Sequence, residues 1–244
     1  MRLARPLVNL LAIGLCCFAG CSSGVASNLL AASAGSPGPD DDLEKILARM
    51  DETAKTFHAA QANFTWTQYN SVVNDTTDKQ EGKIYFRRSG SEIQMAADIV
   101  QPDSKQVIFS HGKIQVFQAK TGVVDVYDAG AHREEVESFL VLGFGGGGQD
   151  MLKSFDVKYL GTETVDGRPA AKLDLTPKSP KIRQNISHIL LWIDPQTGFS
   201  VQQQLFQSSG DYRMAKYTEI LPKSKISDNL FKLKTPESTR VVNH

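Results

Sequence analysis

The sequence predicts a mainly β fold: one long antiparallel meander, forming a curved sheet or barrel, with one amphipathic helix in front of it. Three observations lead to this prediction. Apolar residues recur with a period of two over most of the chain, short turns containing Gly or Asp separate these runs, and most neighbouring runs have no helix-length segment between them. Parallel strands need such crossover segments, so a doubly wound α/β fold is excluded.

The composition is that of an ordinary globular protein. The chain has 244 residues, of which 41% are hydrophobic and 22% charged, with 27 Lys+Arg against 27 Asp+Glu. At roughly 100 to 200 residues per domain, this length suffices for one large domain or two small ones. A nucleic-acid-binding protein would carry a basic excess on one face, so the balanced charge argues against a nucleic-acid partner.

The N-terminus has the layout of a secretory signal. Arg2 and Arg5 precede an apolar stretch, which ends in small residues before Cys21. Residues 18–21, Phe-Ala-Gly-Cys, resemble a bacterial lipobox, which implies a signal peptide over residues 1–20 and a lipidated Cys21. The alternative is an ordinary signal peptide cut near Ala26 or Ala34.

The residues after Cys21 are expected to form a flexible tether. Residues 22–42 are rich in Ser, Gly, Ala and Pro and end in three Asp, a composition that cannot bury apolar surface. A tether over residues 21–42 of about 20 such residues reaches roughly 25 Å. By resemblance to enteric lipoproteins, Ser22 implies anchoring at the outer membrane, facing the periplasm. The folded domain is then expected over residues 43–242.

The domain begins with a predicted helix. Leu43, Ile46, Leu47, Met50 and Phe57 recur at steps of three and four residues, behind acidic residues that suit a helix N-terminus. After this helix the period changes to two. Ten or eleven strands are predicted, including runs at 106–110, 113–118, 123–127, 155–162, 169–175, 186–194, 199–207 and 212–220.

A glycine-rich segment separates the two halves of the meander. Residues 133–142 read as a helix, the run 143–148 is Gly-Phe-Gly-Gly-Gly-Gly, and residues 149–155 resume a helical pattern. A helix with a glycine hinge suits a cover that lies across the mouth of a curved sheet. A plain surface loop beside a packing helix is the alternative.

The sequence offers no catalytic or metal-binding pattern. The five histidines are far apart, the glycine run lacks the Lys-Ser/Thr of a phosphate loop, and GxSxG does not occur. All three cysteines fall within the first 21 residues, so the folded body has no thiol for a disulfide or zinc site. We therefore expect no enzyme, no metal and no cofactor.

Several short segments, in order and spacing, resemble the outer-membrane lipoprotein carrier family, LolA/LolB-like proteins, over roughly residues 43–242. They are Leu-Glu-Lys-Ile at 43–46, Phe-His-Ala at 57–59, Gln-Glu-Gly-Lys-Ile-Tyr-Phe-Arg-Arg at 80–88, Gln-Pro-Asp at 101–103, Ser-His-Gly-Lys at 110–113 and Asn-Leu-Phe-Lys-Leu-Lys-Thr-Pro at 229–236. The resemblance implies an incomplete antiparallel β-barrel of about eleven strands, with a helical lid over an apolar cavity for acyl chains.

Arg88 matches the family's arginine that holds the lid by polar contacts, although Ser89 stands where the family usually has Pro. Arg88 shares its strand parity with Ile84 and Phe86, so its guanidinium is expected on the cavity side, where carbonyls of the lid would be its acceptors. The alternative is an arginine at a strand end that extends into solvent.

The resemblance implies an anchored protein that binds lipids or lipoproteins and acts in outer-membrane lipoprotein sorting. We expect a monomer, with acyl chains, the membrane and transport proteins as partners. The side chains expected to bind acyl chains are Phe64, Trp66, Ile84, Phe86, Met95, Phe139, Trp192 and Phe206.

Two other functions remain open. The first is an envelope-stress regulator or sensor resembling RseB, which uses the same fold without carriage. Because that type usually carries an added C-terminal domain, and none is expected after residue 242, we place it second. The other is an envelope scaffold whose interior is simply a filled core.

Overall fold

The computed structural model describes residues 39–130, 139 and 141–244. The predicted signal peptide, Cys21 and the tether up to residue 38 lie outside the described residues. So do residues 131–138 and 140, which carry most of the helix predicted over 133–142. Within the described part of the chain, no helix combines the length and apolar character that a membrane crossing requires.

The first described element is helix α2 (Pro39–Thr56). It begins four residues before the predicted domain start, so residues 39–42 belong to the helix and not to the tether. Proline suits the first helical turn because its missing N–H has no intrahelical acceptor there, and acidic residues favour the positive end of the helix dipole. The predicted apolar stripe is observed, because Ile46, Leu47 and Met50 are all buried.

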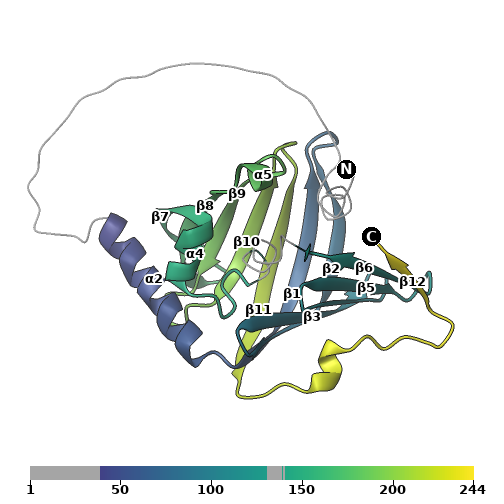
Figure 1. The fold of residues 1–244 in the computed structure, drawn as a ribbon. Coiled ribbons are helices and arrows are strands. Elements are labelled where there is room, and N and C mark those ends of the chain that lie inside the picture. The colour runs from purple at the N-terminus through teal and green to yellow at the C-terminus, as the bar shows by residue number, and fades with distance from the viewer. Residues whose placement is uncertain (1–38, 131–138, 140) are drawn as a thin grey trace, which may run out of the picture.

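Twelve strands form a single sheet in the order β12-β6-β5-β4-β3-β2-β1-β11-β10-β9-β8-β7 (Figure 1). Their bounds are β1 (Ala59–Asn70), β2 (Asp75–Ser89), β3 (Glu92–Gln101), β4 (Lys105–Ser110), β5 (Lys113–Gln118), β6 (Val123–Asp128), β7 (Phe155–Val165), β8 (Arg168–Pro177), β9 (Ile186–Ile193), β10 (Ser200–Gln207), β11 (Tyr212–Lys223) and β12 (Arg240–Asn243).

The sheet consists of two antiparallel meanders that meet at one seam. Strands β1 to β6 form the first meander, strands β7 to β11 form the second, and β1 pairs with β11 in antiparallel register. The sheet ends at β12 on one side and β7 on the other, and these two edges do not pair. The predicted incomplete antiparallel β-barrel is therefore confirmed.

Strand β12 departs from the prediction of a purely antiparallel meander. It runs parallel to β6, with Arg240 opposite Val123 and Asn243 opposite Val126. The chain reaches this position through residues 224–239, which include the short helix η2 (Asp228–Phe231). Four residues are too few for an alternating pattern to be visible in the sequence. Their pairing covers the backbone groups that β6 would otherwise expose at the sheet edge.

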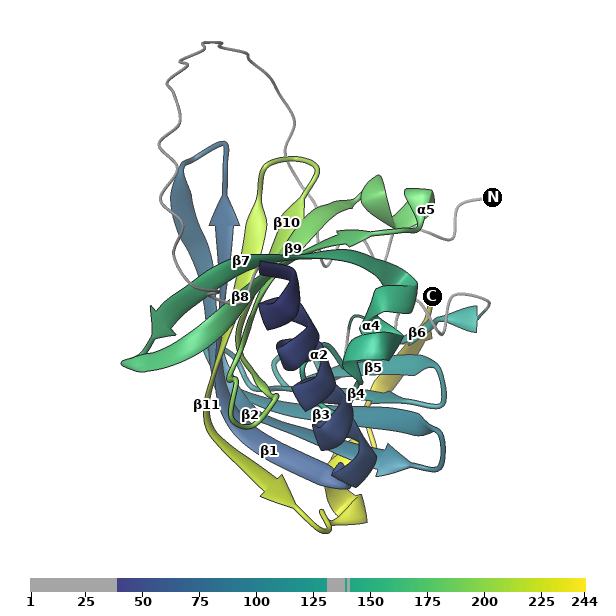
Figure 2. The same cartoon turned by 90° about the vertical axis from the view of Figure 1, so that its left-hand side faces the viewer.

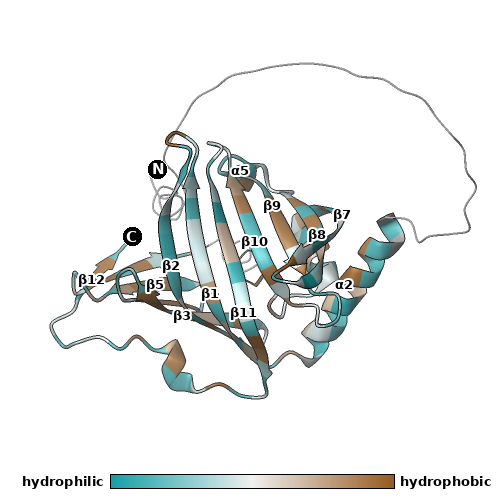
Figure 3. Ribbon diagram, turned by 180° about the vertical axis from the view of Figure 1, so that it is seen from behind, coloured by the Kyte–Doolittle hydropathy of each residue, from teal (hydrophilic) through white to brown (hydrophobic). Residues whose placement is uncertain are grey.

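The sheet curls around helix α2, which precedes the first meander, and the helix that follows this meander (Figure 2). Helix α4 (Gly148–Ser154) matches the predicted helical segment at 149–155, and the short helix α5 (Pro180–Arg183) lies between β8 and β9. We call the side of the sheet that packs against α2 and α4 the inner face. Figure 3 views the outer face of β1, β10 and β11, where hydrophilic and hydrophobic residues are interspersed.

Two buried clusters fill the inner face. The first core combines residues of β1 to β4 and β11 with Phe57, Phe144 and Phe199. The second core combines residues of α2, α4 and β7 to β9. The candidate site lies where the covering segments meet these two clusters.

Candidate functional site

Five of the eight predicted acyl-binding residues lie together on the inner face. Phe64, Ile84, Phe86 and Met95 are buried members of the first core, and Trp66 packs half-buried against it. They share this face because side chains two residues apart in a strand point to the same side. Strands β1, β2 and β3 are direct neighbours, so the alternating pattern becomes a continuous apolar surface.

Phe144, from the glycine-rich segment, covers this surface. Its side chain is fully buried and stacks on Phe86 with ring centroids 4.4 Å apart and planes 10° apart. It also meets the edge of Tyr217 at 4.8 Å and lies 5.9 Å from Phe199. The space in front of Phe86 is therefore occupied by the protein's own side chain.

The glycines on either side of Phe144 make this insertion possible. Gly143 and Gly145 have φ angles of +73° and +87°, in the left-handed region that disfavours other residues. A Cβ atom on Gly145 would lie 2.5 Å from the ring of Phe57. The backbone thus passes too close to its neighbours for any side chain, and only the phenyl group between the two glycines enters the core.

Arg88 joins the covering segments to the sheet. Its guanidinium Nη2 donates to the carbonyl oxygens of Gly145 at 2.9 Å and Ala54 at 3.3 Å, and its Nε donates to that of Phe57 at 3.3 Å. Ala54 lies in the last turn of α2, where unpaired carbonyls form the negative end of the helix dipole. One exposed cation at the end of β2 therefore holds both the C-terminal end of α2 and the glycine-rich segment.

Tyr217 is buried among the apolar side chains of the first core. Burial raises the pKa of the Tyr217 phenol far above its usual value, and a hydrogen bond with Trp66 only partly opposes this. The phenolate would be poorly solvated beside Phe144, so the side chain stays neutral. An interior of this kind suits hydrocarbon and disfavours a charged ligand group.

The second core holds Phe139, another predicted acyl-binding residue. Phe139 packs half-buried against this cluster and meets Phe155 edge to face, with ring centroids 5.2 Å apart and planes 77° apart. Phe139 is therefore on the inner side of the sheet, separated from Phe64 and its neighbours by the boundary between the two clusters.

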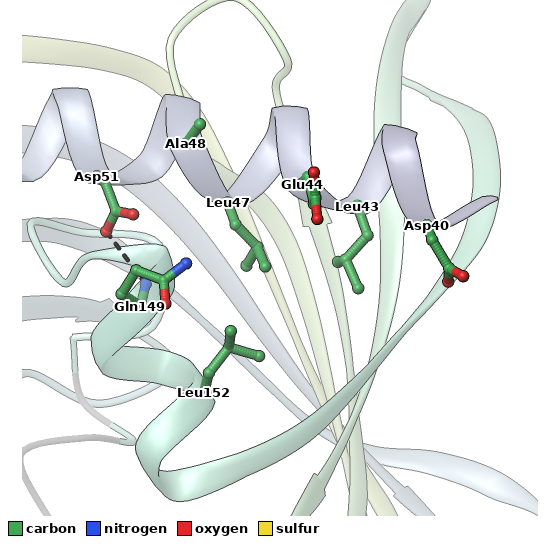
Figure 4. A pocket seen from close by; sticks show the side chains of 8 residues that line it. All are labelled: Asp40, Leu43, Glu44, Leu47, Ala48, Asp51, Gln149 and Leu152. Atoms are coloured by element: carbon green, nitrogen blue, oxygen red, sulfur yellow. Dashed lines mark hydrogen bonds between the residues drawn. The ribbon is translucent and has the colours of Figure 1, made fainter. Parts of the chain in front are cut away.

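A cleft of about 450 Å³ opens between α2 and α4 (Figure 4). Apolar side chains form its floor, and acidic and amide groups form its rim. The lining residues are Asp40, Leu43, Glu44, Leu47, Ala48, Asp51, Gln149 and Leu152. No feature of the sequence located this cleft, because it depends on the angle at which two helices far apart in the chain cross.

The two helices touch at one end of this cleft. A Cβ atom on Gly148 would lie 2.5 Å from the carbonyl oxygen of Leu47 and 2.6 Å from its Cα, so only glycine permits the crossing. One residue further, the backbone N–H of Gln149 donates to Asp51 Oδ1 at 3.1 Å. The residue before α4, Gly147, has no side chain that could cap the helix, so Asp51 of α2 performs this task.

We expect the variant Asp51→Ala to lower the free energy of unfolding by about 1 kcal/mol, because α4 loses the side-chain cap that Asp51 provides. Urea denaturation followed by circular dichroism measures this change. Glu52→Ala is the matched control, since Glu52 is the next residue of α2 and makes only an exposed ion pair with Arg49. Equal effects of the two substitutions would contradict the capping role.

The structure does not bring Trp192 and Phe206 into either core. Leu191 and Ile193 face the second core, so Trp192 between them points to the outer face, where its indole N–H donates to Glu163 at 2.9 Å. Phe206 stacks on His188 at 4.4 Å, also on the outer face. Alternation identified residues that share a face, but it could not say which face the helices cover.

Four inner residues escaped the sequence-based selection of acyl-binding side chains. Phe57, Phe199 and Tyr217 surround Phe144 and complete the first core. A signal for Phe144 was present, because a single large aromatic residue within a run of five glycines has no role in a solvated loop and indicates an anchoring contact. Among the described residues, no group of three or more potential metal ligands gathers.

Comparisons with known proteins rest on structure, because no protein-family profile and no curated protein sequence matches the chain. MucB is similar over 82% of this chain and 65% of its own, with 17% identity and a TM-score of 0.51. This chain thus spans just under two thirds of the length of MucB.

Two further solved structures are similar along nearly their whole length. An uncharacterized conserved protein from Thermus thermophilus matches 83% of this chain and 99% of its own, with 11% identity and a TM-score of 0.50. A LolA superfamily protein from Nitrosomonas europaea matches 78% of this chain and 97% of its own, with 13% identity and a TM-score of 0.38. At such identities the likeness concerns the fold alone, which in this chain is an incomplete antiparallel β-barrel.

Proposed function

We propose that this protein is a membrane-anchored, periplasmic lipid- or lipoprotein-binding protein that shelters acyl chains on the inner face of its sheet and acts in lipoprotein sorting or localisation. It works by binding and not by catalysis. The observation that carries the proposal is an apolar surface of the sheet that residues 143–148 cover with a single side chain, Phe144. Phe144 occupies the space in front of Phe86 and is held there by packing and by the hydrogen bond of Arg88 to Gly145.

The energetics favour an exchange of Phe144 for an acyl chain. Each buried methylene group contributes roughly 0.8 kcal/mol, so a sixteen-carbon chain gains on the order of 12 kcal/mol by leaving water. Exposing one phenyl side chain costs about 1.5–3 kcal/mol. Burial of about two to four methylene groups in place of the ring offsets its exposure, and each further buried methylene counters the loss of the Arg88 hydrogen bonds when residues 143–148 move.

Arg88 has the role of a latch in this proposal. Its guanidinium donates to the backbone carbonyl oxygens of Ala54, Phe57 and Gly145. These hydrogen bonds therefore depend on where the backbone lies and not on which side chains the covering residues carry. Carboxylates and water molecules can replace these carbonyls as acceptors, so Arg88 can release Gly145 without becoming a buried charge that lacks a partner. A lipidated Cys21 would keep the domain at the outer membrane while the latch works, with transport proteins as partners.

Organic extraction of the purified Cys21→Ser protein, followed by mass spectrometry, tests the proposal. The substitution removes the protein's own lipid, so any acyl chain recovered must have been bound non-covalently. We expect about one acyl chain per protein molecule, either after purification or after incubation with vesicles. Recovery of none under both conditions would contradict lipid binding.

A regulator or sensor without carriage is the second candidate. It is favoured by the filled first core and by the likeness to MucB, a protein whose structure has also been solved in complex with MucA. In this case the extracted protein would contain no lipid, and Phe144 would remain in place when an envelope protein partner binds. The same extraction therefore separates the two candidates.

A further inference from the structure

We propose that the cleft between α2 and α4 binds one acyl chain of a lipid whose headgroup carries an ammonium group, as in phosphatidylethanolamine. Asp40 and Glu44 would select this headgroup. This inference rests on the proposed lipid binding and adds to it a second apolar site, beside the second core, with a defined class of headgroup. The tail would lie on Leu43, Leu47 and Leu152, with the headgroup at the open end of the cleft.

The shape of the cleft gives the ligand a direction. The helices meet at Gly148, whose Cα lies directly against the backbone of Leu47, and the Asp51 cap holds this end closed. Figure 4 shows α4 diverging from α2 toward Asp40, with Leu43 and Leu152 pointing into the widening gap. The cleft is wider at Asp40 than at Asp51 and Gln149, so a headgroup fits better at the Asp40 end, with the tail over Leu43, Leu47 and Leu152.

The floor of the cleft continues into the protein interior. Leu47 is buried within the second core, and Leu43 and Leu152 pack half-buried against the same cluster. A hydrocarbon tail in the cleft therefore extends an apolar surface that already exists. The volume of about 450 Å³ lies within the range of about 300–1,000 Å³ that is typical of small-molecule sites.

The charge of the rim is negative. Asp40 and Glu44 line the open end, and within the described residues neither makes an ion pair. Three cations of the two helices are engaged elsewhere, since Lys45 pairs with Asp42, Arg49 with Glu52 and Lys153 with Asp150. The fourth, Lys55, lies in the last turn of α2, at the far end of the helix from Asp40. An ammonium group at this end would be attracted, whereas an anionic headgroup such as phosphatidylglycerol would meet two carboxylates and be repelled.

Acidic residues also favour the first turn of any helix, since they interact with its dipole. The two explanations differ in their consequence for a ligand. A purely structural role of Asp40 and Glu44 predicts a change in helix stability on neutralisation and no change in the selection of headgroups.

The test is isothermal titration calorimetry on the Cys21→Ser protein with three lipids of the same sixteen-carbon chain, used below their micelle concentrations. They are lysophosphatidylethanolamine, uncharged monopalmitoylglycerol and lysophosphatidylglycerol. We expect lysophosphatidylethanolamine to bind about tenfold more tightly than lysophosphatidylglycerol, with monopalmitoylglycerol between them. The double variant Asp40→Asn, Glu44→Gln should abolish this order, whereas Glu52→Gln on the same helix should preserve it.

The variant Ala48→Trp separates the cleft from the first core. Ala48 is exposed on the rim, so the indole can cover the cleft without disturbing the packing of α2, and a thermal melt confirms folding. We expect it to weaken binding of all three lipids at least tenfold, whereas Glu52→Trp should not. Unchanged binding in Ala48→Trp would overturn the cleft as the site, and equal affinities for the three lipids would overturn headgroup selection, while lipid binding itself would stand. Absence of binding for every lipid would instead contradict the proposed function.

Discussion

Replacing Phe144 by Ala is expected to lower the free energy of unfolding by about 3–5 kcal/mol and, at the same time, to tighten the binding of a fluorescent fatty acid. The stability loss follows from complete burial of the ring and from its contacts with Phe86, Tyr217 and Phe199. The gain in affinity follows because the ligand no longer has to displace this ring. Urea denaturation and a fluorescence titration measure the two effects.

Phe155→Ala is the matched control for this experiment. Phe155 is also an almost fully buried phenylalanine, but it lies at the start of β7 in the second core and not on the cover. We expect a similar loss of stability without a gain in affinity for the fatty acid. If both variants bound the fatty acid equally well, cavity creation in general, and not removal of a cover, would explain the result.

Replacing Arg88 by Leu is expected to lower the free energy of unfolding by about 2 kcal/mol and to accelerate release of a bound fatty acid several-fold. The substitution removes donors to the carbonyls of Ala54, Phe57 and Gly145. Hydrogen bonds from charged donors contribute roughly 1.5–3 kcal/mol each when buried, and the exposure of Arg88 reduces their sum. Stopped-flow displacement of the fatty acid measures release.

Arg87→Leu is the control for a nonspecific effect of losing an arginine. Arg87 is adjacent in sequence but points to the opposite face, where it donates to Gln94, pairs with Asp228 and lies 4.0 Å from the ring centroid of Phe231. We expect Arg87→Leu to destabilise the fold without changing the release rate. Equal release rates for Arg88→Leu and the parent protein would contradict the latch.

Much of the architecture could be predicted because it depends on local patterns. The alternation of Phe64 with its polar neighbours defined a strand, and the turns near Gly112 and Gly167 separated strands that pair as hairpins. The same patterns could not predict β12, because its four residues find their partner only through a crossover that passes η2. Parallel pairing of distant segments has no local signature.

The candidate site was predictable only in part, for a related reason. Alternation placed Phe64 and Phe86 on one face, and the structure groups them, but it gave no means of deciding that Trp192 and Phe206 face away from the helices. The parity of Arg88 was readable, whereas its three carbonyl acceptors come from segments 31 to 57 residues away in the chain. Such partners are known only once the segments are packed.

By itself, the sequence determined the number and order of most strands, the amphipathic helix and the apolar face of the first strands. These features depend on the period at which apolar side chains recur and on turn residues, both of which are local. Only the tertiary structure decided which face is covered, that Phe144 fills it, and that α2 and α4 meet at Gly148 and diverge toward Asp40. These features depend on contacts between segments far apart in the chain, where close packing selects one arrangement from several that the local patterns allow equally.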